Sequence, residues 1–256
     1  MTYSLSLSSI AAYYDLSQEK ERTRSNQELV NFYCALIESV KPNACIEIGA
    51  FNAAFSVRMA KLGYPCYAFE ANPYNYNEFR EQLNISNLTY LNKAVSGNNG
   101  HITFHIQSEI DGIKQSPIRG NNSLMIRNND RTTYEEVSVI STTMQSFIGE
   151  ASLSDKSISL WVDVEGATSS IFAEPNHWLS TVSTILIEVE DIPAWKGQWL
   201  SPEVVQFLDE KGFIPIARDF EYKKQYNIVF INRRFINDSN VIDALANFHS
   251  KASQCW

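Results

Sequence analysis

Two short apolar runs that bracket one amphipathic stretch place the strongest constraint on the fold of this chain. The first run, residues 44–48, leads into Gly49, and the second, residues 66–69, leads into Glu70. Between them, apolar residues recur at the spacing of a helix that is covered on one face. The pattern predicts a strand, a tight turn, a helix and a second, parallel strand, joined by a right-handed crossover.

Gly49 and two nearby carboxylates predict a ligand at the carboxyl ends of these strands. Gly49 lets the backbone turn sharply and lets a ligand come close to the chain. Glu70 follows it by about 20 residues, the spacing at which an acidic side chain accepts hydrogen bonds from ribose hydroxyls in nucleotide-binding units. We therefore expect a cofactor that contains a nucleoside.

The turn itself differs from that of dinucleotide-binding proteins. Their turn carries three glycines against a pyrophosphate, whereas an alanine, a phenylalanine, an asparagine and an alanine follow Gly49 here. One glycine between two carboxylates suits a positively charged cofactor without phosphates. S-adenosylmethionine has these properties, and we expect Glu47 to face its ammonium group and Glu70 its ribose. The alternative is an ordinary unit whose strands end on surface carboxylates.

Composition and charge narrow the class of protein. The 256 residues allow one α/β domain or two small ones, and 44% apolar with 20% charged residues is ordinary for a globular protein. A net charge of -8 without a run of lysine and arginine argues against nucleic-acid binding. The sequence shows neither a bilayer-spanning apolar run nor a secretion signal. We expect a cytoplasmic protein that binds neither nucleic acid nor membrane, of unknown oligomeric state.

The rest of the chain continues the alternation of strands and helices. A helix over residues 26–40 is expected to pack on the sheet, which divides the chain into an N-terminal helical segment, 1–42, and a main domain, 43–256. Further strands are predicted at residues 88–95, 158–164, 182–189, 213–217 and 227–232. The last two are close enough to pair as an antiparallel hairpin. The fold class is α/β, with helices on both faces of a mostly parallel sheet.

The middle of the chain departs from this alternation. Residues 101–107 and 137–143 alternate as strands, and the polar stretch 116–129 between them carries proline, glycine and four asparagines. Long loops inside compact domains often close over a functional site, although a mobile excursion without a role is the alternative. Asn122 and Ser123 in this stretch are candidates for hydrogen bonding a polar substrate.

Carboxylates lie at or just after the ends of the strands predicted at residues 158–164 and 182–189. They are Asp163, Glu165, Glu188 and Asp191. Ligands of open α/β sheets bind outside the carboxyl ends of the strands, so these side chains should converge with Glu47 and Glu70. Asp163, Glu165 and Glu188 are candidate general bases for a hydroxyl proton. The alternative for Asp163 and Glu165 is capping of the following helix or pairing with a lysine.

Three further interpretations concern single side chains. Imidazole accepts protons near neutral pH, so His177 is another candidate base, although a histidine beside a tryptophan is more often packed at the surface. Trp195 and Asp191 are candidates for contacting the substrate, while Trp195 in the core is the alternative. Asp163 with Glu190 or Asp191 would offer Mg²⁺ the oxygen ligands it prefers.

Several motifs resemble the FkbM family of methyltransferases over residues 45–232. They lie at residues 47–56, 69–73, 94–96, 142–144, 163–166 and 187–189, and the Asp-Val-Glu-Gly sequence at 163–166 is the most specific. The resemblance implies a Rossmann-like class I methyltransferase fold and methyl transfer from S-adenosylmethionine, usually to oxygen on a sugar or secondary metabolite. The alternatives are N-methylation of a peptide or amine, and a cofactor-binding protein of the same fold that has lost catalysis. The acceptor is then a small molecule, a glycan or a peptide.

The resemblance also assigns the residues that contact the cofactor. They are Glu47, Gly49, Ala50, Phe51, Asn52, Ser56, Glu70, Ala71, Asn72, Ala94 and Asp163. The usual motif of the family is Asp-x-Gly-Ala-Asn-x-Gly, and this chain has Glu47, Phe51 and Ala53 in place of the acid, the asparagine and the second glycine. Ala53 adds a methyl group where the helix approaches the cofactor, a departure that favours loss of catalysis. The intact Asp163–Glu165 pair favours an enzyme.

Overall fold

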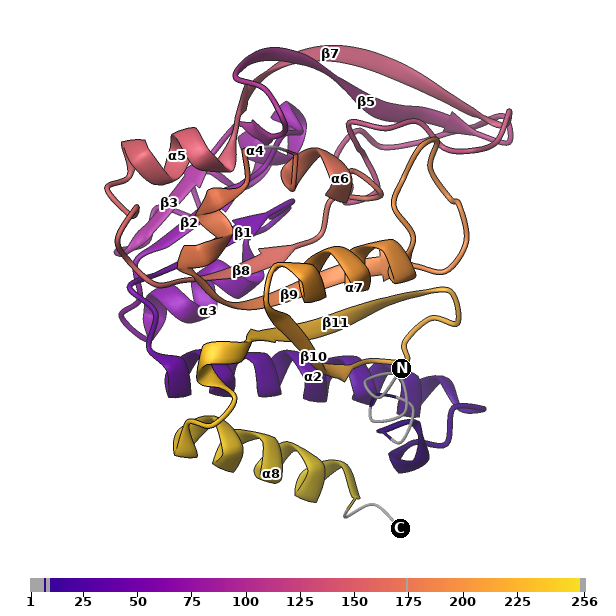
Figure 1. Ribbon diagram of the computed structural model, residues 1–256. Helices are drawn as coiled ribbons and strands as arrows, with labels where there is room; N and C mark the ends of the chain where they lie inside the picture. The colour runs from indigo at the N-terminus through magenta and orange to yellow at the C-terminus, as the bar shows by residue number, and fades with distance from the viewer. Residues whose placement is uncertain (1–6, 8–9, 174, 254–256) are drawn as a thin grey trace.

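A seven-stranded sheet forms the centre of the protein in its computed structural model, which describes residue 7 and residues 10–173 and 175–253. Its strands are β1 (Ala44–Ile48), β2 (Cys66–Phe69), β3 (Leu88–Leu91), β8 (Ile158–Val162), β9 (Val182–Glu190), β10 (Phe213–Arg218) and β11 (Gln225–Asn232). They lie in the order β10-β11-β9-β8-β1-β2-β3 (Figure 1). The strands from β3 to β9 are parallel, and β11 runs antiparallel to both of its neighbours. The predicted α/β class and the terminal hairpin are confirmed.

Helices cover both faces of this sheet, as predicted. One face packs against α2 (Glu19–Val40), α3 (Ala54–Lys61) and α8 (Ser239–Ser253), and the other against α5 (Met144–Glu150), α6 (Thr168–Ile171) and α7 (Ser201–Glu210). Helix α4 (Pro73–Phe79) follows β2, and short 3-10 turns lie at η1 (Ala11–Tyr13), η2 (His177–Thr181) and η3 (Arg233–Phe235). Within the described residues, no helix is both long and apolar enough to cross a bilayer.

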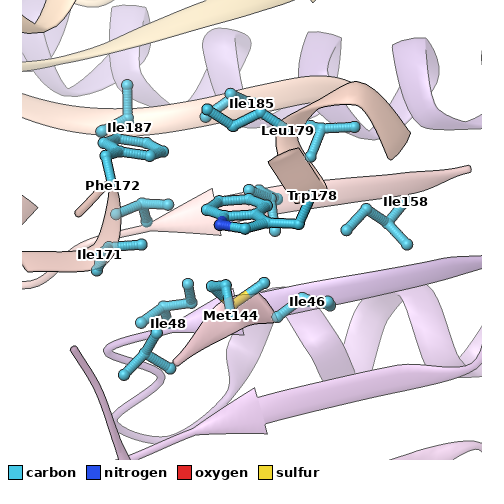
Figure 2. Close-up of a cluster of buried hydrophobic side chains, with 14 of the residues drawn as sticks. Ile46, Ile48, Met144, Ile158, Ile171, Phe172, Trp178, Leu179, Ile185 and Ile187 are labelled. Carbon is cyan, nitrogen blue, oxygen red and sulfur yellow. The ribbon is translucent and has the colours of Figure 1, made fainter. Parts of the chain in front are cut away.

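Side chains of β1 alternate between two separate hydrophobic cores. Ile46 and Ile48 face the core that contains Trp178 and Met144 (Figure 2), whereas Cys45 faces the core beneath α2 and α3. Each large apolar side chain buried in such a core contributes about 1.5–3 kcal/mol. Because side chains alternate along a strand, Glu47 shares the face of Cys45 and lies beneath α3.

A second, four-stranded sheet lies beside the first. It consists of β4 (Ala94–Val95), β5 (Gly100–Ile110), β6 (Ile113–Lys114) and β7 (Thr132–Thr142), in the order β4-β7-β5-β6. The long antiparallel pair of β5 and β7 runs along the top of the molecule in Figure 1, and each strand is longer than the one predicted there. The single strand predicted at 88–95 is wrong, because its two halves belong to different sheets. Asn92 fixes this break, since its amide donates to the carbonyl of Glu70 over 2.9 Å.

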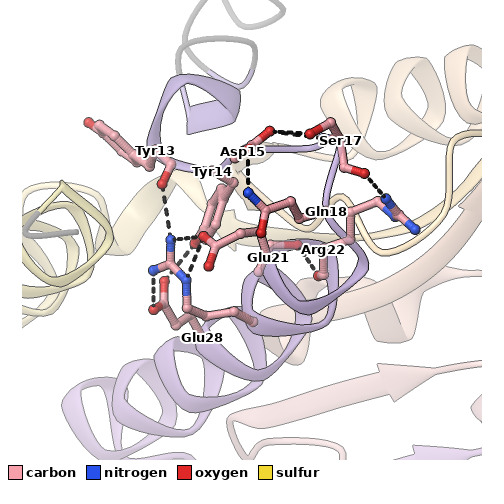
Figure 3. Close-up of polar contacts among 10 residues, drawn as sticks. Tyr13, Tyr14, Asp15, Ser17, Gln18, Glu21, Arg22 and Glu28 are labelled. Carbon is pink, nitrogen blue, oxygen red and sulfur yellow. Dashed lines mark hydrogen bonds and ion pairs between the residues drawn. The ribbon is translucent and has the colours of Figure 1, made fainter. Parts of the chain in front are cut away.

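The N-terminal segment is tied to the sheet through α2, which starts seven residues earlier than predicted. Leu29 and Phe32 of α2 share a core with Leu186 of β9. Before α2, polar contacts fix the chain (Figure 3): the Arg24 guanidinium donates to Glu28 over 2.8 Å and to the carbonyl of Tyr13 over 3.1 Å. The packing of the helical segment on the sheet is therefore observed, while a domain division at residue 42 stays a prediction.

Candidate active site

A cavity of about 820 Å³, the open space at its mouth included, lies at the carboxyl ends of β1, β2 and β8. Parallel strands bring these ends to one edge of the sheet. Of the cofactor residues expected from the sequence, the wall contains Gly49, Phe51, Glu70, Ala71, Ala94 and Asp163. Of the other candidates, it contains Glu165 and Asn122.

The turn after β1 has an unusual backbone. Gly49, Phe51 and Ala53 all have positive φ, at 82°, 46° and 53°. Left-handed backbone costs a residue with a Cβ about 1–2 kcal/mol, and asparagine and glycine tolerate it best. At Phe51 and Ala53, the asparagine and glycine of the usual family motif would adopt this left-handed backbone at lower cost than the residues of this chain.

Glu70 holds this turn together and still has acceptor capacity. One carboxylate oxygen accepts from the N–H of Phe51 and the other from the N–H of Asn72, both over 2.7 Å. Burial raises the pKa of Glu70 to about 7, against the effect of these hydrogen bonds. The Asn75 side chain also donates to Glu70, and because a carboxylate has about four lone-pair sites, Glu70 keeps acceptor capacity for a ribose hydroxyl. Its position in the cavity wall therefore fits the expected cofactor.

Glu47 does not line the cavity. Its Oε2 accepts from the N–H of Ser56 over 2.9 Å, in the first turn of α3, and both residues are buried. A carboxylate there satisfies a free helix N–H and opposes the helix dipole. The structure therefore gives Glu47 a role in holding α3, and the expected contact with an ammonium group has no basis in its position.

The remaining cofactor candidates, Ala50, Asn52 and Asn72, surround the cavity without lining it. The N–H of Ala50 donates to the carbonyl of Phe69 over 2.8 Å, and the Asn52 side chain is exposed. Asn72 caps α4 by accepting from the N–H of Tyr74 over 2.9 Å. These residues shape the backbone of the site.

Three carboxylates converge at the ends of β8 and β9. One oxygen from each of Asp163, Glu165 and Glu188 lies within 4.8 Å of the others. Burial is the main reason that the pKa of each is raised. The charges of Asp163 and Glu165 raise the pKa of Glu188 further. The hydrogen bond between Glu188 and Asp163 has the opposite effect on Asp163 and lowers the Asp163 pKa. Of this hydrogen-bonded pair, Asp163 is thus the better proton acceptor.

The metal ligands expected from the sequence need correction. Glu190 is engaged by Gln198, whose amide donates to it over 3.1 Å. Asp191 is exposed and accepts from the hydroxyls of Ser201 and Tyr226 over 2.5 and 2.9 Å. Among the described residues, neither Glu190 nor Asp191 belongs to the group of carboxylates that has metal-ligand spacing around Asp163. The group with the spacing of metal ligands is Asp163, Glu165 and Glu188, and these oxygens are of the type that Mg²⁺ prefers.

The other candidates lie outside the cavity wall. His177 is exposed in η2, which precedes the amino end of β9 and is therefore at the opposite edge of the sheet. Trp195 is 1% exposed and packs on Gly166, where a Cβ would lie 2.6 Å from its ring. Ser123 is also buried, and its hydroxyl donates to the carbonyl of Glu165 over 2.7 Å.

Sequence reasoning missed residues that complete the site. Asn75 lines the cavity and binds Arg119 twice, donating to its carbonyl and accepting from its N–H, both over 3.0 Å. Arg127 places a guanidinium nitrogen 3.6 Å from Glu165 Oε2. Neither contact has a local sequence signal, because each joins elements more than 35 residues apart.

The strand order, the terminal hairpin and the single-glycine turn define a class I methyltransferase fold. The family model described as the methyltransferase FkbM domain matches residues 41–215, more than half of the chain. The chain belongs to this family, which confirms the resemblance seen in its motifs. It is an S-adenosylmethionine-dependent methyltransferase.

Solved structures with a similar course of the chain share little sequence with it. Magnesium protoporphyrin IX methyltransferase from Synechocystis PCC 6803, with bound S-adenosylmethionine, is 10% identical at a TM-score of 0.47, covering 85% of this chain and 84% of that one. The 1,6-didemethyltoxoflavin N1-methyltransferase of Burkholderia thailandensis is 10% identical at a TM-score of 0.40, with coverages of 90% and 89%. No curated protein is a significant match.

Proposed function

We propose that this protein transfers the methyl group to a hydroxyl oxygen of a sugar or a secondary metabolite. The observation that carries the proposal is the position of Asp163, an acceptor for a proton in the wall of the cavity that also contains Glu70. When bound, S-adenosylmethionine supplies a methyl group on a positively charged sulfur. A hydroxyl becomes a good nucleophile for it only as its proton leaves, so a positioned base is needed.

The residues of the chain divide this work between them. Glu70 accepts a hydrogen bond from the ribose, and the turn at Gly49 lets the cofactor approach the backbone. Asp163 takes the proton of the acceptor, and Glu188 lies beside it. Orienting the two reactants contributes up to roughly 7–11 kcal/mol to such a reaction, and the buried walls of the cavity supply that orientation.

A second candidate is methylation of an amine, including one on a peptide. Three carboxylates within 4.8 Å of one another would attract an ammonium group and take up its proton. Oxygen and nitrogen acceptors need the same in-line arrangement, so the geometry of the site suits both. If the reaction uses Mg²⁺, the same carboxylates would hold the ion. The bound ion would then orient the acceptor oxygen.

The test is formation of S-adenosylhomocysteine from S-adenosylmethionine with matched panels of hydroxyl and amine acceptors, each with and without a chelator. Product that forms only with hydroxyl acceptors supports the proposal. Product only with amines would replace it by the second candidate, and a chelator effect would identify a metal. Tight cofactor binding in calorimetry without product from any acceptor would indicate the non-catalytic alternative.

A further inference from the structure

Two arginines lie on the segment 116–129, whose residues Gly120, Asn122 and Leu124 form part of the cavity wall. In the chain, Arg119 immediately precedes this run and Arg127 follows it; each is joined to a residue of the cavity wall, Arg119 through its backbone to Asn75 and Arg127 through its guanidinium to Glu165. Both arginines are half-buried. The established cofactor chemistry uses neither of them, and the candidate base chemistry uses neither.

The face of the Arg127 guanidinium packs on an aromatic ring, so the N–H groups at its edges remain able to donate hydrogen bonds. Its guanidinium stacks over the ring of Trp195, 3.9 Å from the centroid, and its side chain is 25% exposed. Its one close charged contact among the described residues is Glu165, at 3.6 Å, which is beyond hydrogen-bond distance. Guanidinium offers five donors in a rigid fork that matches two oxygens of a carboxylate or phosphate.

Arg119 is positioned by its backbone. Its N–H and its carbonyl are both bonded to the Asn75 side chain, over 3.0 Å. Its guanidinium donates to Gln115 Oε1 over 2.8 Å, which uses one of its donors. Burial and the nearby charge of Arg127 lower the pKa of Arg119. The two guanidinium groups are thus near enough to repel each other, and the charge of Glu165 acts on both of them, while that of Glu190 acts on Arg127.

We propose that Arg119 and Arg127 bind an oxyanion on the methyl acceptor, a phosphate or a carboxylate group, at the mouth of the cavity. An anion between the two guanidiniums removes their mutual repulsion and satisfies the free donors of Arg127. The acceptor is thereby oriented with its neutral, reactive end toward Asp163. This inference rests on the proposed methyl transfer to a small acceptor and specifies the charge class of that acceptor.

The experiment measures anion binding directly, with the full chain saturated with S-adenosylhomocysteine. Inorganic phosphate and acetate are the probes, followed by ³¹P and ¹³C NMR titrations, because they carry the two oxyanions without the rest of an acceptor. We expect saturable binding of at least one anion near about 1 mM. Preference for phosphate indicates a phosphorylated acceptor, and preference for acetate a carboxylated one.

Variants assign this binding to the two side chains. Arg127→Gln and Arg119→Gln should each weaken binding of the preferred anion roughly tenfold. Arg127→Lys keeps the charge but loses the fork, and should fall between Arg127→Gln and the unchanged protein. The matched control is Arg131→Gln, which removes the same charge from an exposed side chain paired with Asp111 and should leave binding unchanged. Unaltered Tm values show that the variants fold.

Three results would overturn the inference. They are absence of saturable binding of both anions, an equal loss in Arg131→Gln, and a loss of S-adenosylhomocysteine affinity in Arg127→Gln that matches its loss of anion affinity. The last result would mean that the arginines hold the carboxylate of the cofactor. Because no turnover is measured, anion binding stays readable even if methyl transfer to a hydroxyl proves wrong.

Discussion

The carbonyl oxygen of Asp163 lies 1.7 Å from the position that a Cβ on Gly49 would occupy. The turn after β1 and the end of β8 are therefore in backbone contact, and the N–H of Asp163 donates to the carbonyl of Ile48 over 2.9 Å. This contact sets the candidate base against the cofactor turn. It also explains why position 49 requires glycine, although alanine stands at position 53, where the family motif has its second glycine.

Gly49→Ala should prevent this close approach. The added Cβ would meet backbone, which cannot rotate away, so we expect a loss of more than about 3 kcal/mol in the free energy of unfolding. The matched control is Gly63→Ala, because Gly63 also has positive φ, at 94°, but has open space around it. That variant should lose only about 1–2 kcal/mol from backbone strain. Urea denaturation measures both, and equal losses would contradict the steric argument.

Glu70→Ala should abolish tight cofactor binding. A hydrogen bond to a charged group is worth about 1.5–3 kcal/mol, so loss of the ribose bond lowers affinity at least about tenfold. The variant also frees the N–H groups of Phe51 and Asn72, which loosens the turn. Calorimetry with S-adenosylhomocysteine measures the effect, and Glu78→Ala on the exposed face of α4 is the control. An unchanged dissociation constant would remove Glu70 from the cofactor site.

Asn75→Ala should loosen the segment 116–129. The two hydrogen bonds to the backbone of Arg119 disappear, while the fold of the sheet is untouched. We expect trypsin to cleave after Arg119 several-fold faster, and added cofactor and acceptor to slow cleavage if the segment closes over them. Asn77→Ala, two residues along on the exposed side of α4, should cleave like the unchanged protein. Equal rates in all three proteins would mean that the segment is held by other contacts.

Stability should fall as pH rises. Burial raises the pKa of Glu47 and of Glu70 to about 7, whereas glutamate in an unfolded chain titrates near 4.3. The folded state therefore binds more protons between these values, so stability is full below about pH 4.5 and is lost as pH rises through about 7. For each of the two groups, the free energy of unfolding that is lost across this pH range is on the order of 3 kcal/mol.

Thermal unfolding of the cofactor-free protein from pH 5 to pH 8 measures this effect. We expect Tm to decrease across the range, with a smaller decrease in Glu47→Gln, whose amide oxygen can still accept from Ser56. A Tm that increases toward pH 8 would show that these carboxyls are ionised at little cost. Activity should follow the opposite trend, because a general base must be deprotonated.

Local sequence patterns predicted more of the fold than of the candidate site. The βαβ unit at Gly49 and the hairpin at the end of the sheet depend on neighbours in the chain, and both were predicted. The face on which Glu47 lies was not, because β1 is buried on both sides and its sequence has no polar side to orient it. The start of α2 was missed because residues 19–25 have too few apolar residues to show helical periodicity.

Asp163, Glu165 and Glu188 were expected to converge because each lies at the carboxyl end of an apolar strand, and their carboxylates do lie together. Arg127 was not expected, because it reaches Glu165 from a loop with no pattern of its own. His177 is exposed, as its alternative interpretation stated, and its role as a candidate base finds no support in its position. Its position in the chain, between β8 and β9, does not say at which edge of the sheet the connection runs.

Asp163→Asn should separate cofactor binding from catalysis. The substitution is nearly isosteric and keeps the backbone contacts with Ile48 and Gly49, so the fold and S-adenosylhomocysteine affinity should be preserved. Proton acceptance is lost, which should lower methyl transfer by roughly 10²–10⁴-fold. Asp155→Asn, on an exposed loop before β8, is the matched control and should keep full activity.

The same variant distinguishes the two possible roles of Asp163. If it acts as a base, the residual activity should be insensitive to Mg²⁺ and to a chelator, and should rise with pH only as hydroxide replaces the base. If it binds a metal, the unchanged protein should lose activity with a chelator, and Asp163→Asn should no longer respond to added Mg²⁺. Full activity of Asp163→Asn at neutral pH would exclude both roles. The proton would then have to leave through Glu165, whose buried carboxyl lies in the same cavity wall.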